Sequence, residues 1–84
     1  MKKIEIYTTQ WCPYCHAAKS ILDEKGASYE EVDADDPEVR MAMVQRANGR
    51  RTVPQIFVGE THVGGYDDLA ALDRRGALDP LLAS

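Results

Sequence analysis

The sequence changes its hydrophobic periodicity close to the N-terminus, and this change limits the folds that are open to the chain. Residues 3–8 alternate between two sides, which is typical of a strand. From Pro13 to Lys25 the apolar residues recur at helical spacing, and Gly26 follows where a helix commonly ends. The helical apolar positions are Tyr14, Ala17, Ala18, Ile21 and Leu22. A strand that leads directly into a helix predicts an α/β unit at the start of the domain.

The rest of the chain continues to alternate between strand-like and helix-like patterns. We expect a strand over residues 27–33 and a helix over residues 37–47. A hairpin of two strands, 55–58 and 61–63, and a last helix over residues 66–75 are expected to follow. Asp36 and Pro37 suit the cap and the first turn of the second helix, and Gly59-Glu60 suits the hairpin turn. Three leucines are expected to pack the tail onto the domain, namely Leu78, Leu81 and Leu82.

The predicted order of elements, β-α-β-α-β-β-α, indicates an α/β fold with a four-stranded mixed sheet and helices on both faces. The first strand, helix and second strand form a βαβ unit, so we expect these two strands to be parallel with a right-handed crossover. The hairpin adds two antiparallel strands. The second helix is expected to face the core through Val39, Ala42, Met43 and Ala47, and Met41 is also interpreted as packing.

Composition and charge limit the partners that the chain is expected to bind. The sequence has 84 residues and a net charge of −4, so we expect a single domain over residues 1–84 that binds neither nucleic acid nor an anionic membrane. No apolar run approaches the roughly 18 residues that a membrane-spanning helix needs. The basic start Met1-Lys2-Lys3 is followed by Ile4-Glu5-Ile6 rather than by the apolar run of a secretory signal. The expected state is therefore a monomer in the cytoplasm.

The only two cysteines, Cys12 and Cys15, lie where the first strand gives way to the first helix. A disulfide between them would close a very short loop and constrain the unfolded chain little, so a redox role is favoured over a structural one. A helix N-terminus has unpaired N–H groups and a partial positive charge, and both favour a thiolate. We therefore expect Cys12 to be the more exposed cysteine, to have the lower pKa and to act as the nucleophile. Cys15, deeper in the helix, is expected to resolve the mixed disulfide formed at Cys12.

Three other interpretations of the cysteine pair compete with redox chemistry. The cysteines could be inert, one structural and one incidental. Cys12, Cys15 and His16 also match the C-x-x-C-H pattern of c-type haem attachment, but such chains are normally exported and the first residues predict no signal peptide. Zinc would need His16 and His62 as further ligands, and the sequence lacks the second half of a paired zinc module. We expect no metal site, and His16 is interpreted as an exposed helical residue.

Three motifs occur in the order that is typical of a known family: Cys12-Pro13-Tyr14-Cys15, Thr52-Val53-Pro54 and Gly64-Gly65-Tyr66-Asp67-Asp68-Leu69. Together they resemble the dithiol glutaredoxins of the bacterial glutaredoxin 3 type, over nearly the whole chain from Ile4 to Leu82. The resemblance implies a thioredoxin-like fold. It also implies reduction of protein disulfides and of glutathione mixed disulfides, with glutathione as the reducing co-substrate and no tightly bound cofactor.

The resemblance further implies which residues bind glutathione. These residues are Tyr14, Arg40, Thr52, Val53, Pro54, Gly65, Asp67 and Asp68. Pro54 is expected to be cis and to face the cysteines, which leaves the Val53 N–H and C=O free for the glutathione backbone. N–H groups near Gly65 would hold the γ-glutamyl carboxylate, and Asp67 and Asp68 would accept the ammonium group.

The glycyl carboxylate of glutathione needs a cation, and here the sequence departs from the family. A lysine often precedes the first cysteine by three residues, but Thr9 occupies that position. The resemblance favours Arg40 as the cation and leaves Arg50 and Arg51 as alternatives. Trp11, directly before the first cysteine, is open to two interpretations: an exposed indole that contacts substrates, or partial packing against the loop.

Protein partners are expected among glutathionylated or disulfide-containing proteins, and ribonucleotide reductase is one target that the resemblance suggests. Some glutaredoxins instead hold an iron–sulfur cluster between two chains, through the first cysteine of each chain and two glutathiones. A cluster scaffold is therefore the alternative function. Pro13 after Cys12 is associated with the redox members of the family, which favours the oxidoreductase.

Overall fold

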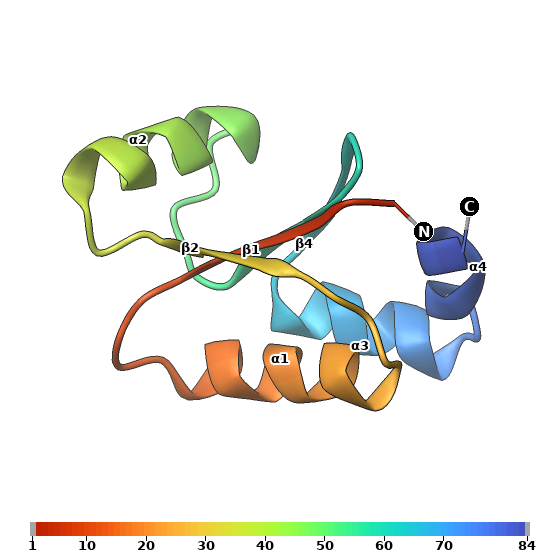
Figure 1. Ribbon diagram of the computed structural model, residues 1–84. Coiled ribbons are helices and arrows are strands. Elements are labelled where there is room, and N and C mark those ends of the chain that lie inside the picture. The colour runs from red at the N-terminus through yellow and green to blue at the C-terminus, as the bar shows by residue number, and fades with distance from the viewer. Residues whose placement is uncertain (1, 84) are drawn as a thin grey trace.

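A sheet of four strands forms the centre of the computed structural model, which describes residues 2–83 (Figure 1). The strands are β1 (Ile4–Thr8), β2 (Glu30–Asp33), β3 (Gln55–Val58) and β4 (Thr61–Gly64), in the spatial order β2-β1-β3-β4. β1 is parallel to β2 and antiparallel to β3, and β4 is antiparallel to β3. The predicted mixed sheet is therefore confirmed. The two ends of the predicted domain, residues 1 and 84, lie outside the described residues.

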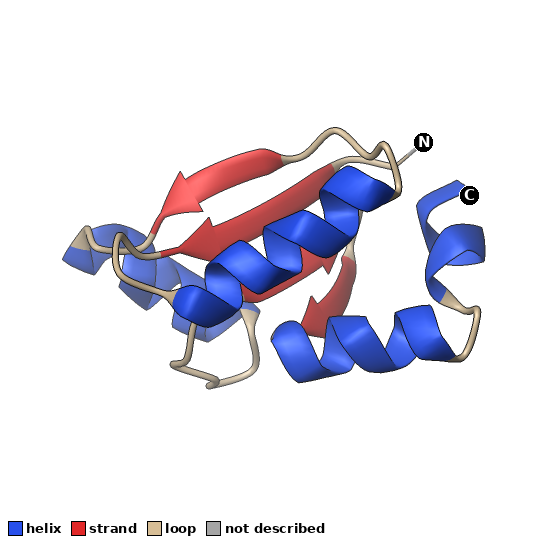
Figure 2. Cartoon of the chain, turned by 90° about the horizontal axis from the view of Figure 1, so that it is seen from below, coloured by secondary structure: helices blue, strands red, loops and turns tan. Residues whose placement is uncertain are grey.

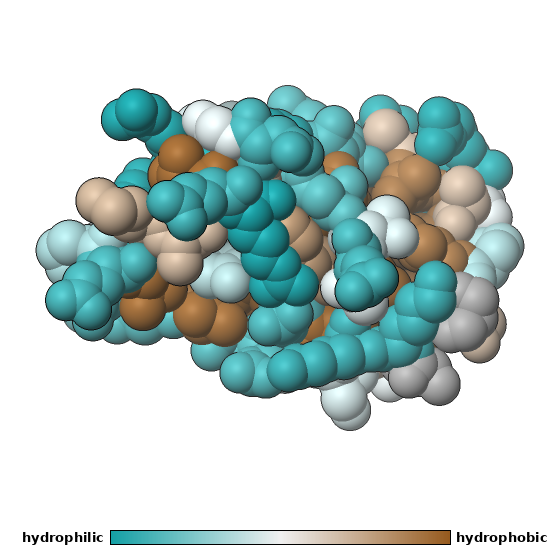
Figure 3. Space-filling view, turned by 90° about the horizontal axis from the view of Figure 1, so that it is seen from above, coloured by the Kyte–Doolittle hydropathy of each residue, from teal (hydrophilic) through white to brown (hydrophobic). Residues whose placement is uncertain are grey.

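The helices lie on both faces of the sheet, as predicted (Figures 1 and 2). They are α1 (Pro13–Glu24), α2 (Pro37–Arg46), α3 (Tyr66–Arg74) and α4 (Leu78–Ala83). α2 covers one face, whereas α1, α3 and α4 pack against the other. Seen from the α2 side, the surface is largely hydrophilic, with smaller apolar areas between the polar side chains (Figure 3).

Each face of the sheet has its own apolar cluster because the side chains of β1 alternate. Ile4 and Ile6 point to the larger cluster, which also contains Leu22 of α1 and Leu69 of α3. On the α2 side, the buried residues are Tyr7, Ala34, Met43, Ala47 and Phe57. The Tyr7 and Phe57 rings meet edge to face, with their centroids 5.7 Å apart.

Two segments differ from the elements that the sequence predicts. β2 begins at Glu30 rather than at residue 27, because the backbone of Ala27 is hydrogen-bonded to the last turn of α1. The Ala27 N–H donates to the Leu22 carbonyl at 3.1 Å there. The C-terminal tail forms a short helix, α4, that was not predicted, and its Leu78 and Leu82 are buried against the domain as expected.

The prediction for the core side of α2 is wrong at two residues. Met41 is 66% exposed and Ala42 is also exposed, whereas Met43 is fully buried. Residues two apart on a helix point about 200° apart, so Met41 must face away from the sheet when Met43 faces it. Val44 is half-buried instead and packs against the same cluster as Met43.

Replacing Met43 by Ala is expected to lower the free energy of unfolding by about 2–5 kcal/mol, because it removes a fully buried side chain and leaves a cavity. The matched variant Met41→Ala removes an exposed side chain of the same helix and should change that free energy by less than about 0.5 kcal/mol. Urea unfolding followed by far-UV circular dichroism measures both. Equal destabilisation by the two substitutions would contradict the described packing of α2.

Candidate active site

Cys12 is the N-cap residue of α1, and Cys15 lies in the first turn of the helix. The Cys15 N–H donates to Cys12 Sγ at 3.1 Å, and the His16 N–H donates to the Cys12 carbonyl at 3.2 Å. Pro13 occupies the start of the helix, where its missing N–H leaves no donor unpaired. The first turn of α1 is therefore built around the sulfur atom of Cys12.

The two cysteines form a disulfide, and their Cα atoms lie 5.2 Å apart. Cys12 is 8% exposed and Cys15 is 1% exposed. Cys12 is thus the more accessible of the two, in the direction that the sequence predicts. A sulfur atom of a partner molecule can approach Cys12, whereas the helix and the core shield Cys15.

The segment Thr52-Val53-Pro54 lies against the cysteine pair. The Val53–Pro54 peptide bond is cis, as the resemblance implies. The Val53 carbonyl oxygen lies 3.8 Å from Cys12 Sγ. The Val53 N–H has no hydrogen-bond partner within residues 2–83. The loop therefore offers an unused backbone donor beside the Cys12 sulfur.

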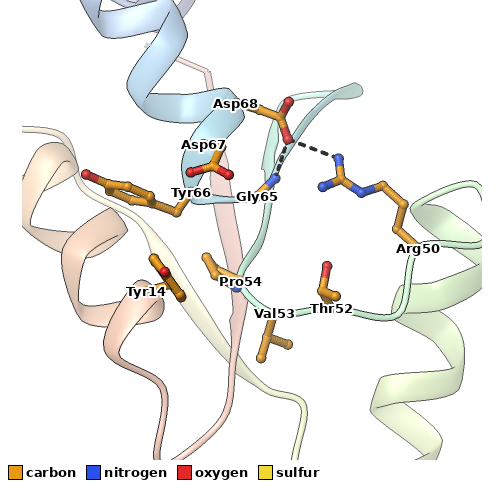
Figure 4. Close-up of a pocket in the computed structure, with 9 residues that line it drawn as sticks. All are labelled: Tyr14, Arg50, Thr52, Val53, Pro54, Gly65, Tyr66, Asp67 and Asp68. Carbon is orange, nitrogen blue, oxygen red and sulfur yellow. Dashed lines mark hydrogen bonds and ion pairs between the residues drawn. The ribbon is translucent and has the colours of Figure 1, made fainter.

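An open cleft of about 240 Å³ lies between this loop and the start of α3 (Figure 4). All but one of the residues predicted to bind glutathione line it: Tyr14, Thr52, Val53, Pro54, Gly65, Asp67 and Asp68. Arg50 and Tyr66 line it as well, and the ring centroids of Tyr66 and Tyr14 lie 5.8 Å apart. Tyr14 is 63% exposed, so it belongs to the wall of the cleft rather than to the apolar side of α1.

Asp68 joins two sides of the cleft through one carboxylate oxygen. The Gly65 N–H donates to Asp68 Oδ2 at 2.9 Å, and Arg50 Nη1 donates to the same oxygen at 3.0 Å (Figure 4). The Gly65 hydrogen bond outweighs burial and, with Arg50, holds the pKa of Asp68 below its ordinary value. Gly64 has a φ of +114°, and a side chain there would collide with Asp68 and Arg50. Asp68 is thus a fixed anion that ties the start of α3 to Arg50.

The predicted residue that the structure does not bring to the cleft is Arg40. Its Nη2 donates to the Arg51 carbonyl at 2.9 Å, and its side chain lines a separate surface hollow beside Met41. Arg50 is the arginine that reaches the cleft. Trp11 is 88% exposed, which decides between the two interpretations of its indole in favour of exposure.

In the part of the chain that the structure describes, potential metal ligands do not gather around the cysteines. Within residues 2–83, His, Cys, Asp and Glu side chains form no group of three or more that could hold a metal ion. His16 is exposed on α1, and His62 lies on β4 with its ring bonded to Gln55. In the same part of the chain, no helix has the length and apolar character needed to span a membrane.

Sequence reasoning missed two residues that support the site, Gln55 and His62. Gln55 is fully buried at the start of β3, where it bonds to Thr52 and to His62. The sequence predicts this strand as an apolar run, and that prediction gives no role to its first residue, Gln55. The signal in the sequence is the amide itself, because a polar side chain in a buried strand needs hydrogen-bond partners.

Cys12 and Cys15 can exchange between a dithiol and the disulfide that they form here, and the fold leaves Cys12 more open than Cys15 to a partner sulfur. Such a pair on a sheet of this topology defines a class of protein, the thiol–disulfide oxidoreductases with a thioredoxin-like fold. Within that class the chain belongs to the glutaredoxin family, because the family model Glutaredoxin matches residues 4–63. The resemblance drawn from the three motifs is thereby confirmed.

Individual relatives agree with this assignment along the whole chain. The chain is 51% identical to Glutaredoxin 3 of Escherichia coli over 82 residues, which are 98% of this chain and 99% of that protein. It is 53% identical to a Glutaredoxin of Pseudomonas aeruginosa over 85 residues, 100% of each chain. The solution structure of Glutaredoxin from Brucella melitensis superposes with a TM-score of 0.87 at 53% identity, over 98% of this chain and 89% of that one. The buckwheat glutaredoxin–glutathione complex superposes with a TM-score of 0.89 at 31% identity, over 98% of this chain and 77% of that one.

Asp68→Asn is expected to destabilise the protein at neutral pH, and the difference from wild type should shrink as the pH falls below about 4. The folded-state pKa of Asp68 is lowered, so its contribution to stability is present above the unfolded value and is lost as the carboxylate becomes protonated. Asp67→Asn is the matched control, because Asp67 is exposed and makes no side-chain hydrogen bond within residues 2–83. Urea unfolding at a series of pH values measures the difference in the free energy of unfolding between Asp68→Asn and wild type. A difference that does not change with pH would contradict this role of Asp68.

Proposed function

We propose that this protein is a glutathione-dependent oxidoreductase that reduces protein disulfides and glutathione mixed disulfides. The observation that carries the proposal is the position of the cleft: Val53, which lines it, has its carbonyl oxygen 3.8 Å from Cys12 Sγ. A tripeptide bound in the cleft would hold its own sulfur against that of Cys12. The likeness to the buckwheat protein, which was solved as a glutaredoxin–glutathione complex, supports the same ligand here.

The unused backbone groups of the cleft suit the peptide part of glutathione. The Val53 N–H and C=O would pair with the backbone of its cysteinyl residue, in the manner of an added strand. The first N–H groups of α3, those of Tyr66 and Asp67 beside Gly65, would hold the γ-glutamyl carboxylate. The carboxylates of Asp67 and Asp68 would face the ammonium group, and Tyr14 would cover the ligand from the side of α1.

The glycyl carboxylate is left for an arginine outside the residues that line the cleft. Arg50 pairs with Asp68 beside the start of α3, which is the γ-glutamyl end in this orientation. Arg40 and Arg51 form no ion pair within residues 2–83, so both guanidinium groups can accept an anion. We therefore assign the glycyl carboxylate to Arg40, with Arg51 beside it.

Removal of glutathione from a protein would need only Cys12. Its thiolate attacks the glutathione sulfur of the mixed disulfide, and the protein thiolate leaves. A second glutathione thiolate then attacks that same glutathione sulfur, which releases the Cys12 thiolate and yields glutathione disulfide. Cys15 takes no part in this route.

Reduction of a protein disulfide would need both cysteines. The Cys12 thiolate attacks one substrate sulfur, and the other substrate sulfur leaves as a thiolate. The Cys15 thiolate then attacks Cys12 Sγ and releases the substrate, which leaves the Cys12–Cys15 disulfide that the structure contains. Two glutathiones reduce that disulfide again. The proposed partners are glutathionylated or disulfide-containing proteins in the cytoplasm, ribonucleotide reductase among them, and the proposed active form is a monomer.

An iron–sulfur scaffold is the second candidate, and one solved structure favours keeping it. That structure, described as "Metal Binding of Glutaredoxins", is 53% identical to this chain and has a TM-score of 0.75 over 98% of it. As in the glutaredoxins that hold such a cluster, its ligands would be Cys12 of two chains and two glutathiones. The visible spectrum of protein purified without oxygen separates the candidates: the oxidoreductase alone is colourless, and a cluster protein is brown.

Cys12→Ser is expected to abolish both activities, because every route begins at the Cys12 sulfur. Cys15→Ser should abolish only the reduction of protein disulfides and should retain removal of glutathione from a glutathionylated peptide. Glutathione-coupled assays with one glutathionylated peptide and one disulfide-bonded peptide measure the two activities. Equal loss of both activities in the two variants would contradict the proposed roles of Cys12 as nucleophile and Cys15 as resolving cysteine.

A further inference from the structure

Gln55 carries a polar side chain that is 0% exposed, at the start of an otherwise apolar strand. Its Nε2 lies 2.9 Å from the Thr52 carbonyl oxygen and 3.3 Å from Thr52 Oγ1. Its Oε1 lies 2.7 Å from His62 Nε2. The amide thus joins β4 to the loop that carries Val53, behind the wall of the cleft. Burying an amide is costly unless its hydrogen bonds are made, so these contacts fix its place.

The direction of each hydrogen bond follows from the chemistry of Thr52. A carbonyl oxygen can only accept, so the NH₂ group of Gln55 must face Thr52 and its oxygen must face His62. His62 must then carry its proton on Nε2 and donate it to Gln55. Burial, together with Arg50, lowers the pKa of His62. The ring that donates to Gln55 near pH 7 is therefore the neutral one, with its proton on Nε2. The ring also stacks on Phe57, with centroids 4.8 Å apart, which fixes its plane.

This hydrogen-bond relay, which runs from His62 through Gln55 to the Thr52 carbonyl, determines which way the Thr52–Val53 peptide faces. The C=O and the N–H of a trans peptide point in opposite directions because the unit is planar. Gln55 holds the Thr52 C=O toward the buried side of the loop. The Val53 N–H of the same peptide must therefore point away from Gln55, to the side on which Val53 lines the cleft.

We propose that Gln55 and His62 are positioning residues for the glutathionyl part of the substrate. His62 holds the orientation of the Gln55 amide, Gln55 holds the Thr52 carbonyl, and the Val53 N–H is thereby aimed at the ligand backbone. Neither side chain lines the cleft. The inference rests on the proposed function, because it assigns to these two residues the affinity for glutathione rather than the sulfur exchange itself.

The test compares two oxidants of the fully reduced protein, glutathione disulfide and hydroxyethyl disulfide, which has no peptide group. Stopped-flow fluorescence of Trp11, beside Cys12, follows each oxidation. Gln55→Met keeps the volume of the side chain but cannot donate to Thr52. The concentration of glutathione disulfide at half-saturation is expected to rise about three- to tenfold, the loss typical of one neutral hydrogen bond, with the limiting rate within about twofold. The second-order rate constant with hydroxyethyl disulfide should change less than about twofold.

A second pair of variants tests the relay at a half-buried position, where folding is less at risk. His62→Leu removes the donor to Gln55 and should weaken the response to glutathione disulfide in the same way as Gln55→Met. His62→Gln supplies a new N–H donor and should restore most of the wild-type half-saturation. Unchanged half-saturation in His62→Leu and Gln55→Met, in a protein whose wild type prefers glutathione disulfide, overturns this inference alone. A wild type that does not prefer glutathione disulfide over hydroxyethyl disulfide overturns the inference together with the proposed function.

Discussion

The hydrogen bond from the Cys15 N–H to Cys12 Sγ is the interaction on which the site depends. A helix begins best where a side-chain atom accepts one of its unpaired N–H groups, and oxygen usually fills this role. Here the accepting atom is the sulfur that does the chemistry. The bond that starts α1 is therefore also the bond that favours negative charge on Cys12, so local folding and reactivity have one physical cause.

The rest of the fold brings other segments to that sulfur. β1 and β3 are antiparallel neighbours with Tyr7 opposite Gln55, so the loop that follows β1 lies beside the loop that precedes β3. The first of these loops carries Cys12, and the second carries Val53. β4 then leads into α3, whose start adds Gly65 and the ion pair of Asp68 with Arg50. The cleft is thus a consequence of strand order, and the start of a helix and an arginine give it one polar end.

The sequence predicts the parts of this site whose chemistry is local. Cys12 and Cys15 at a strand–helix junction, and the cis peptide before Pro54, follow from motifs that lie in a few adjacent residues. The sequence does not predict contacts between segments. Gln55 and His62 meet because His62 pairs with Phe57, two residues from Gln55 on the same face of β3, and that pairing cannot be seen in either segment alone.

Errors in the prediction also have physical causes. The sequence places Met41 in the core of a helix with few strongly apolar residues, where position around the helix rather than residue type decides burial.

The proposed chemistry depends on a lowered pKa of Cys12. Because Thr9 stands in place of a lysine, the start of α1 is the main support for that lowered pKa. The measurement is the pH dependence of alkylation of Cys12 by iodoacetamide in reduced Cys15→Ser protein, which keeps the residue-15 N–H. The account predicts a Cys12 pKa at least one unit below the value of about 8.5 for a free cysteine, and a pKa at or above that value would contradict it.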